Sequence, residues 1–186
     1  MARSACLFAL ALGGCVVNNP SYVAPPPIAV PATLQIQLNN VNGVSVGGAS
    51  LWETPKGVFM RVSTSGLTGT GWHAIHFHEH GDCSGANFAG AGAHVGHETG
   101  RHGLLNPLGP EAGDLPNFAA PTAEIPMLEI YAPNVTLGGV AQGARAPLRD
   151  SDGSALVIHA NADDHLSQPI GGAGDRIACA IIPPAG

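Results

Sequence analysis

Short runs of alternating apolar and polar residues, separated by glycine and proline, constrain the fold of this chain more than any other feature. Leu34 to Asn39 carries an apolar side chain at every second position, and the runs 49–54 and 58–63 flank the turn Pro55-Lys56-Gly57. Side chains alternate between two faces along an extended strand, so this period predicts β-strands. Similar runs lie at 127–131, 134–137, 154–159 and 176–182. With 26 glycines and 16 prolines to make turns, the 186-residue chain predicts an antiparallel sandwich or barrel.

The N-terminal residues have the pattern of an export signal. Residues 1–14 contain one basic residue, Arg3, and the apolar run 5–12. The four residues Leu12-Gly13-Gly14-Cys15 resemble a bacterial lipobox, so we expect 1–14 to be a lipoprotein-type signal peptide and Cys15 to carry a lipid anchor. An ordinary signal peptide cut elsewhere is the alternative. Either alternative takes the protein out of the cytoplasm, and the first predicts a periplasmic protein held to a membrane of a bacterial cell envelope.

The chain beyond the signal divides into a tether and a domain. Residues 15–32 are proline-rich and lack periodicity, which predicts an extended tether, and residues 33–186 form the domain. Of the four cysteines, Cys6 is removed with the signal peptide and Cys15 carries the lipid. Cys83 and Cys179 then remain as a pair in an oxidising compartment. Joining them would close a loop of nearly a hundred residues, worth about 4 to 5 kcal/mol on the chain-entropy model.

The charge composition excludes some classes of partner. The formal net charge is −6, and only seven residues are Lys or Arg. Nucleic-acid surfaces use Lys and Arg to bind phosphates, so we expect no nucleic-acid partner. No apolar run reaches the ~18 to 20 residues of a membrane-spanning helix. The sequence carries no signal for the oligomeric state, and a homodimer is compatible with it.

The stretch GWHAIHFHEHGDCS, residues 71–84, places four histidines within eight residues. In a strand, His76 and His78 point to the same face, a few ångströms apart, whereas His73 points to the opposite face. Neutral imidazole is the commonest metal ligand, and a cluster of nitrogen donors suits copper or zinc. We therefore expect ligands at His76 and His78, a structural role for His73, and solvent exposure for His80. A histidine-rich surface loop is the alternative from these residues alone.

Two long loops interrupt the strand pattern. It disappears from residue 81 to residue 126, which is too long for an ordinary connection in a compact domain. Donors of metal ions recur along this loop, so we expect a metal to hold it; they are His94, His97, His102, Glu111 and Asp114. A second polar loop follows at 160–175, in which we expect His165 to face solvent.

Together these motifs resemble the copper/zinc superoxide dismutase family. AIHFHEHGDCS, residues 74–84, resembles the copper-ligand signature of the family, and GGAGDRIACAII, residues 171–182, resembles its C-terminal signature. AGAHVGHETGRHG, AGDLPN and ALVIHANADDHLSQP match in order and spacing between them. The resemblance covers about residues 33–182. It implies an all-β fold, an antiparallel Greek-key β-sandwich or barrel of immunoglobulin-like type, with two long functional loops.

The resemblance implies a copper site and an activity. The residues that match its copper ligands are His76, His78, His94 and His159. Arg176 matches the guanidinium that attracts and orients superoxide, although a surface ion pair with Asp175 is the alternative. The family converts two superoxide ions and two protons into oxygen and hydrogen peroxide, with the residues at Arg176 and His94 as catalytic groups.

The resemblance also implies a zinc site, and one position departs from it. His94 matches a ligand that bridges copper and zinc, and His102 and Asp114 match zinc ligands. The family usually has a further zinc-binding histidine three residues before the aspartate, where this chain has Glu111. A carboxylate oxygen binds zinc at about the same distance as imidazole. Glu111 therefore either completes a site of two histidines and two carboxylates, or leaves the site weakened or empty.

Two further matches complete the implied site. Asp163 matches a carboxylate that links ligands of the two metals, and Cys83 and Cys179 match a disulfide pair. The first expected function is dismutation of superoxide with copper and zinc as cofactors. The alternative is a non-enzymatic copper-binding or copper-buffering protein on the same fold. The presence of every copper-ligand match together with Arg176 favours the enzyme.

Overall fold

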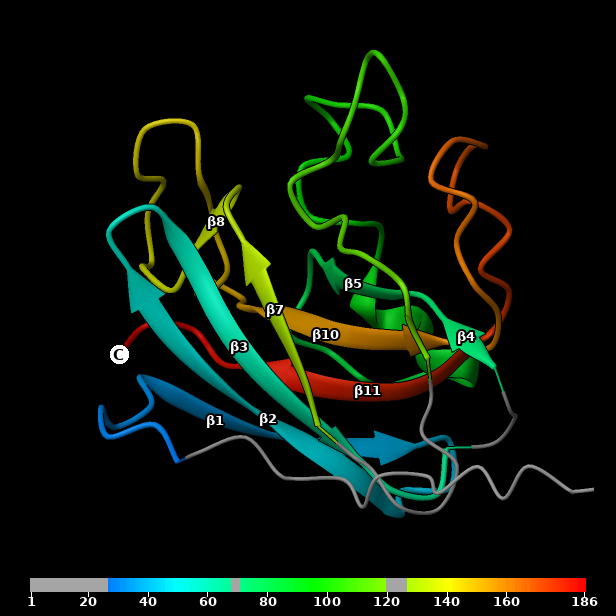
Figure 1. Ribbon diagram of the computed structural model, residues 1–186, viewed down its shortest axis with the longest axis horizontal. Helices are drawn as coiled ribbons and strands as arrows, with labels where there is room; N and C mark the ends of the chain where they lie inside the picture. The colour runs from blue at the N-terminus through cyan, green and yellow to red at the C-terminus, as the bar shows by residue number, and fades with distance from the viewer. Residues whose placement is uncertain (1–26, 68–70, 120–126) are drawn as a thin grey trace, which may run out of the picture.

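Seven strands form one antiparallel sheet that curls around its core (Figure 1). In the computed structural model, which describes residues 27–67, 71–119 and 127–186, their order across the sheet is β5-β10-β11-β1-β2-β3-β7. Their bounds are β1 Leu34–Asn40, β2 Ser45–Thr54, β3 Gly57–Thr64, β5 Ile75–His78, β7 Leu128–Ala132, β10 Ser154–His159 and β11 Arg176–Ile182. The last strand, β11, lies between β10 and the first strand, so the connections cross over as in a Greek key. The all-β, antiparallel fold class is confirmed.

The remaining elements are short. Two-residue strands form two small ladders: β4 Trp72–His73 with β6 Phe118–Ala119, and β8 Val135–Thr136 with β9 Ala146–Pro147. A 3₁₀ segment, η1, spans Ala86–Ala91. No helix among the described residues is long and apolar enough to span a membrane. The predicted signal peptide, Cys15 and most of the predicted tether lie outside the described residues.

The turn between β2 and β3 shows why glycine is required there. The two strands pair from Thr54↔Gly57 onward, and Gly57 has a φ of +154°. A Cβ atom at this position would lie 2.4 Å from the carbonyl oxygen of Ala132 at the end of β7. Only glycine lets the backbones of β3 and β7 approach this closely.

Alternation along β5 separates the core from the functional face. Ile75 and Phe77 are fully buried in the main core cluster, with side chains from six other strands of the sheet. Because side chains alternate, His76 and His78 point to the outer face of the sheet. β10 is buried on both faces: Leu156 belongs to the main core, and the outer face packs against η1. The outer face at β5 and β10 is therefore covered by loops.

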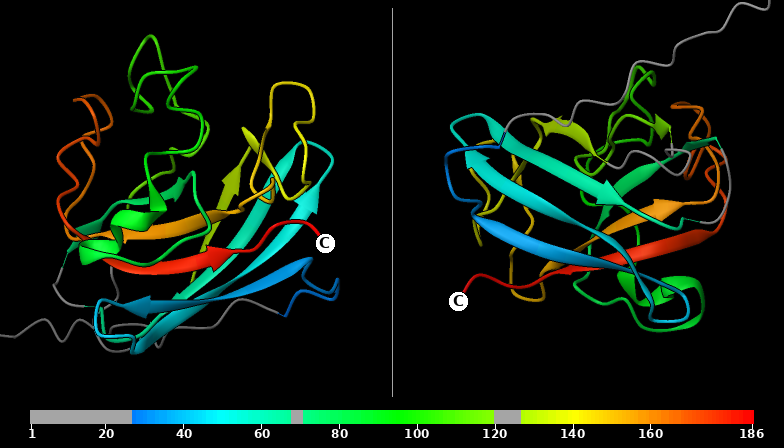
Figure 2. Two further views of the ribbon diagram at one scale, coloured as in Figure 1. Left: turned by 180° about the vertical axis from the view of Figure 1, so that it is seen from behind. Right: turned by 60° about the horizontal axis from the view of Figure 1, so that its bottom comes forward.

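The two long loops provide this cover. The part of the first loop that follows η1 rises side by side with residues 160–175 from the same side of the sheet, as Figures 1 and 2 show. The first loop docks on the edge strand β5 through backbone hydrogen bonds from Phe77 N to Gly113 O (3.0 Å) and from Val95 N to Phe77 O (2.9 Å). The strand-free region expected at 81–126 thus contains η1 and β6, and its backbone is paired with β5.

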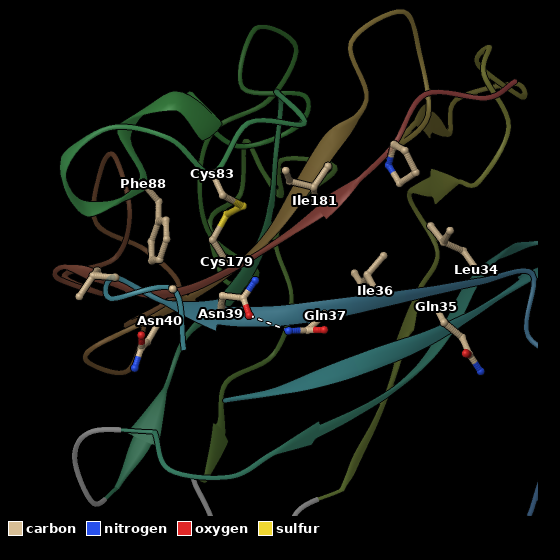
Figure 3. A pocket seen from close by; sticks show the side chains of 13 residues that line it. Leu34, Gln35, Ile36, Gln37, Asn39, Asn40, Cys83, Phe88, Cys179 and Ile181 are labelled. Atoms are coloured by element: carbon tan, nitrogen blue, oxygen red, sulfur yellow. Dashed lines mark hydrogen bonds between the residues drawn. A yellow bond between two sulfur atoms is a disulfide. The ribbon is translucent and has the colours of Figure 1, made fainter. Parts of the chain in front are cut away.

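A disulfide between Cys83 and Cys179 ties the first loop to β11 (Figure 3). It joins residues 96 positions apart, with a Cα–Cα distance of 5.9 Å. Phe88 of η1 packs beside it in the second apolar cluster. The predicted pairing is confirmed, and it fixes the loop next to the strand that begins with Arg176.

Candidate metal centre

Four buried histidines from three parts of the chain meet on the outer face of the sheet. His76 and His78 lie on β5, His159 ends β10, and His94 comes from the first long loop. These four residues are called the first metal group. One ring nitrogen from each lies within 4.8 Å of the other three. β10 pairs with β5 through Val157↔His76, and an isolated bridge sets His94 opposite His78. The fold therefore brings together all residues predicted to bind copper.

Hydrogen bonds assign the tautomers of two of these rings. Nδ1 of His78 donates to the carbonyl oxygen of Gly92 (3.0 Å), and Nδ1 of His159 donates to that of Gly174 (3.1 Å). A carbonyl oxygen only accepts, so both protons are on Nδ1 and both Nε2 atoms carry lone pairs. These Nε2 atoms lie 3.4 Å apart. Two acceptors that face each other at this distance fit two ligands of one metal ion.

The other two rings direct lone pairs to the same place. Nε2 of His76 donates to the carboxylate of Asp163 (3.0 Å), which leaves Nδ1 as the acceptor. His94 uses Nδ1 to contact carboxylates and has Nε2 free. Nδ1 of His76 and Nε2 of His94 are buried and without a hydrogen-bond partner among the described residues. Orphaned acceptors of this kind are costly unless a ligand occupies them, so the group fits a transition-metal ion.

Burial keeps three of these rings neutral. It lowers the pKa of His76 to about 4, despite the opposing hydrogen bond to Asp163. Burial and the neighbouring His76 lower the pKa of His159 to about 3, and burial together with His94 also holds the pKa of His78 well below its ordinary value. Neutral imidazole is the form that binds metal, so these rings are ready as ligands at neutral pH.

A second set of donors shares His94 with the first. His94, His102, Glu111 and Asp114, the second metal group, also place one donor atom each within 4.8 Å of the others, and all four residues are buried. Oδ1 of Asp114 lies 3.1 Å from Nδ1 of His94 and 2.9 Å from Nδ1 of His102. Oε2 of Glu111 lies 3.0 Å and 3.8 Å from the same two nitrogens. Two histidines and two carboxylates fit a tetrahedral zinc ion.

In the second metal group, protons on the imidazoles offset the negative charge of the carboxylates. Burial opposes protonation of His102, but its hydrogen bonds to Asp114 and Asp163 raise its pKa to about 10. The pKa of Asp114 is well below its ordinary value, because the hydrogen bonds from His102 and His94 outweigh the opposing effect of burial. Hydrogen bonds to Asp114 and Glu111 likewise outweigh burial and raise the pKa of His94. A divalent cation at this position would replace protons on the imidazoles.

Asp163 connects the two groups. Its Oδ2 accepts from Nε2 of His76 and its Oδ1 from Nε2 of His102, both at 3.0 Å. The carboxylate is buried and its pKa is lowered, since these hydrogen bonds outweigh the effect of burial. Asn117 fixes the backbone at this position, accepting from Asp163 N (2.8 Å) and donating to Asp163 O (2.7 Å). A Cβ atom at Gly171 would lie 1.6 Å from Oδ1 of Asp163, so glycine is required beside it.

Arg176 lines a cavity of about 480 Å³ that reaches the second metal group, here called the substrate cavity. Other residues that line it are His94, Arg101, Glu111, Gln168 and Ile170. The guanidinium of Arg176 donates to the carbonyl oxygens of Phe88 (2.8 Å) and Gly92 (2.6 Å). Gly92 also accepts from His78, so one carbonyl group fixes Arg176 and a ligand of the first metal group. No described residue forms an ion pair with Arg176, so the surface ion pair with Asp175 is not formed.

The other histidines lie outside both groups. His73 is buried and its Nδ1 contacts the backbone oxygen of His159 (2.7 Å), which is the structural role expected. His80 is half-exposed and pairs with Asp152, whereas His97 contacts Glu79 at 3.2 Å. The expectation that His165 faces solvent is wrong: its side chain is only 19% exposed and lies 3.3 Å from Asp163. His165 itself has a left-handed backbone, with a φ of +61°.

Sequence reasoning missed the groups that support the site. Asn117 was contained in the matched motif AGDLPN, yet nothing in its residue type announces hydrogen bonds to a residue 46 positions away. The carbonyl of Gly92 and the lining residue Arg101 were also not identified. Their contributions depend on how the loops fold in space, which residue types alone do not specify.

Comparison with known proteins gives one consistent result. A family model described as copper/zinc superoxide dismutase matches residues 46–182. The chain is 50% identical over 142 residues to a Cu-Zn superoxide dismutase of Caulobacter vibrioides, which covers 76% of this chain and 80% of that protein. A superoxide dismutase-like protein from Bacillus subtilis is 32% identical, with a TM-score of 0.72 over 80% of this chain and 97% of that one. The Cu/Zn superoxide dismutase from Brucella abortus is 25% identical, with a TM-score of 0.61 over 80% and 98%.

Proposed function

Because the chain belongs to the copper/zinc superoxide dismutase family, an oxidoreductase family with bacterial members, we propose that it converts superoxide into oxygen and hydrogen peroxide. The observation that carries the proposal is the convergence of four imidazole lone pairs in the first metal group, next to a cavity lined by Arg176. Copper at this group would supply the one-electron redox change that dismutation requires.

The residues around the cavity supply binding and proton transfer. The guanidinium of Arg176 keeps its positive charge although burial lowers its pKa, and it is held in place by two carbonyl oxygens. It attracts and orients the superoxide anion in a protein whose formal net charge is −6. Nε2 of His94 would hold a proton beside the first metal group whenever it does not bind copper, because no described residue competes for that atom. Two protons and two superoxide ions yield one oxygen and one hydrogen peroxide.

We propose that Glu111 completes the zinc site in place of the usual histidine. Its carboxylate contacts both histidines of the second metal group and is nearly buried. Zinc there would hold His94 from the side opposite the first metal group, and Asp163 would keep His102 and His76 in their tautomers. The site would then combine two imidazoles and two carboxylates on one divalent ion.

Metal analysis combined with a direct rate measurement tests both parts of the proposal. Purified protein is loaded with copper and zinc, its metal content is measured, and superoxide decay is followed after pulse radiolysis. One copper and one zinc per chain with rapid decay is the expected result. Full copper occupancy without decay would rule the enzyme out and favour the copper-buffering alternative. Substoichiometric zinc that Glu111→His restores would show that the glutamate weakens the site.

The envelope location is a separate proposal. The lipobox-like residues ending in Cys15 support a signal peptide over 1–14, a lipid anchor on Cys15 and a periplasmic domain on a tether. Labelling with a radioactive fatty acid should modify the protein and spare the variant Cys15→Ser. A labelled variant would contradict the anchor. For the oligomeric state a homodimer remains a prediction, which light scattering on the purified protein would decide.

A further inference from the structure

The protein holds the four donors of the second metal group with unequal firmness. Asp114 is tightly fixed: Oδ1 contacts two imidazoles, and Oδ2 accepts from Gly103 N (2.8 Å) and Glu111 N (3.0 Å). His102 is fixed from both sides, with Nδ1 on Asp114 and Nε2 on Asp163. Neither side chain is exposed. These two donors cannot leave the site without breaking several buried hydrogen bonds.

Glu111 is held much more loosely. Its Oε2 contacts Nδ1 of His94 and, at 3.8 Å, Nδ1 of His102. No described residue donates a hydrogen bond to its Oε1. Its side chain is 9% exposed, more than that of any other donor in the group. Glu111 is therefore the donor that can rotate away at the lowest cost.

The exposed side of Glu111 faces the substrate cavity. Of the four donors, only Glu111 and His94 line this cavity, whereas His102 and Asp114 do not. His94 belongs to both metal groups, and its backbone is bridged to His78. The second metal position thus has one side that opens toward a space large enough for a hydrated ion, and Glu111 covers that side.

We propose that the metal ion of the second group enters and leaves through the substrate cavity, with the carboxylate of Glu111 moving aside to admit it. This inference rests on the proposed function, since it requires a divalent ion such as zinc in the group. Glu111 is the anionic donor on this path, where its carboxylate offsets part of the positive charge of Arg101 and Arg176 in the same lining. Substrate and second metal would then share one route.

Narrowing the cavity without touching any donor tests the route. In Ile170→Trp a partly buried wall residue becomes larger, while in the control Leu166→Trp the same change is made at an exposed residue of the same loop that does not line the cavity. Zinc release from the copper-loaded protein is followed with a chromophoric chelator. Cobalt uptake into the zinc-free protein is followed by visible absorption.

Ile170→Trp should slow uptake and release by the same factor, about tenfold, so that the dissociation constant stays unchanged. Leu166→Trp should match the wild type. Wild-type rates in folded Ile170→Trp would overturn the proposed route. If Ile170→Trp does not fold, Arg101→Trp is compared with Arg101→Ala, because Arg101 lines the cavity with an exposed side chain and both variants remove the same charge. Equal rates in these two variants would overturn the route.

The experiment separates this inference from the proposed function. Absence of zinc binding to the wild type would defeat the zinc part of the proposed function before any rate is compared. If the wild type binds zinc normally and neither cavity variant changes the rates of metal uptake and release, only the proposed route is contradicted. A rate change in Leu166→Trp equal to that in Ile170→Trp would also count against the cavity, since it would indicate a general effect on the loop.

Discussion

Replacing Asp163 by asparagine should weaken metal binding although the two side chains have nearly the same size. Asp163 accepts one hydrogen bond from His76 and one from His102, each at 3.0 Å. Asparagine offers one oxygen acceptor and one NH₂ donor. One of the two histidines must therefore change its tautomer. The proton then moves to Nδ1, which is the atom that each ring directs toward its metal group.

The size of the effect follows from what is lost. A hydrogen bond to a charged group contributes about 1.5 to 3 kcal/mol. Loss of a partner that orients a ligating histidine typically lowers metal affinity about 10- to 100-fold. We expect a decrease in this range for copper in the first metal group or for zinc in the second, depending on which ring the NH₂ group faces.

Competition with chelators of known affinity measures both dissociation constants, and electron paramagnetic resonance reports the geometry of Cu(II). The matched control is Asp164→Asn, because Asp164 is an exposed neighbour whose Oδ1 accepts from the backbone of Leu166 and Ser167. This control should bind both metals like the wild type. Unchanged affinity for both copper and zinc in Asp163→Asn would refute the tautomers assigned here.

Three further predictions address stability, steering and the disulfide. The metal-free protein should be most stable near pH 6.5. The raised pKa of His102 makes the free energy of unfolding fall as the pH rises from about 6.5 toward 10, and the lowered pKa of His159 makes it fall as the pH drops from about 6.5 toward 3. Thermal unfolding measured across this pH range checks the prediction. Arg176→Ala should lower the rate constant of dismutation about 10- to 100-fold and reduce its dependence on salt concentration. Lys56→Ala, which removes the same charge far from the cavity, is the control. Equal rate constants for Arg176→Ala and the wild type at low salt would contradict this prediction. Cys83→Ser should lower the free energy of unfolding by about 4 to 5 kcal/mol in denaturant titrations, and a loss below about 1 kcal/mol would contradict the loop-entropy argument.

The sequence predicted the strands best where packing follows simple alternation. The bounds 154–159 and 176–182 are confirmed by β10 and β11, whose apolar runs are buried in the centre of the sheet. β2 begins at Ser45, four residues before the run expected at 49–54, because Gly47 and Gly48 pair with β1 without contributing an apolar side chain. Periodicity cannot detect a strand segment made of glycine.

The ligands of the site could be predicted from the sequence, because the matched motifs specify which residue type stands at each ligand position. The two groups of donors contain every residue that the matched motifs predicted as a ligand, and Glu111, the position that departs from the family pattern, lies with the second group. The roles of loop backbone were not predictable. The carbonyl of Gly92 accepts hydrogen bonds from both His78 and Arg176, and Nδ1 of His165 lies 3.3 Å from Asp163. Such contacts come from how the loops fold on β5, which residue types do not encode locally.

The central claim is that this chain dismutates superoxide at copper held by the first metal group. Pulse radiolysis on protein with measured copper and zinc content tests it directly, alongside His159→Ala, which removes one lone pair of the group. We predict that superoxide decays in a first-order reaction whose rate constant is proportional to the concentration of copper-loaded wild-type protein. The variant should lose this catalysed decay. Copper-replete wild-type protein that leaves superoxide decay at its uncatalysed rate would contradict the claim.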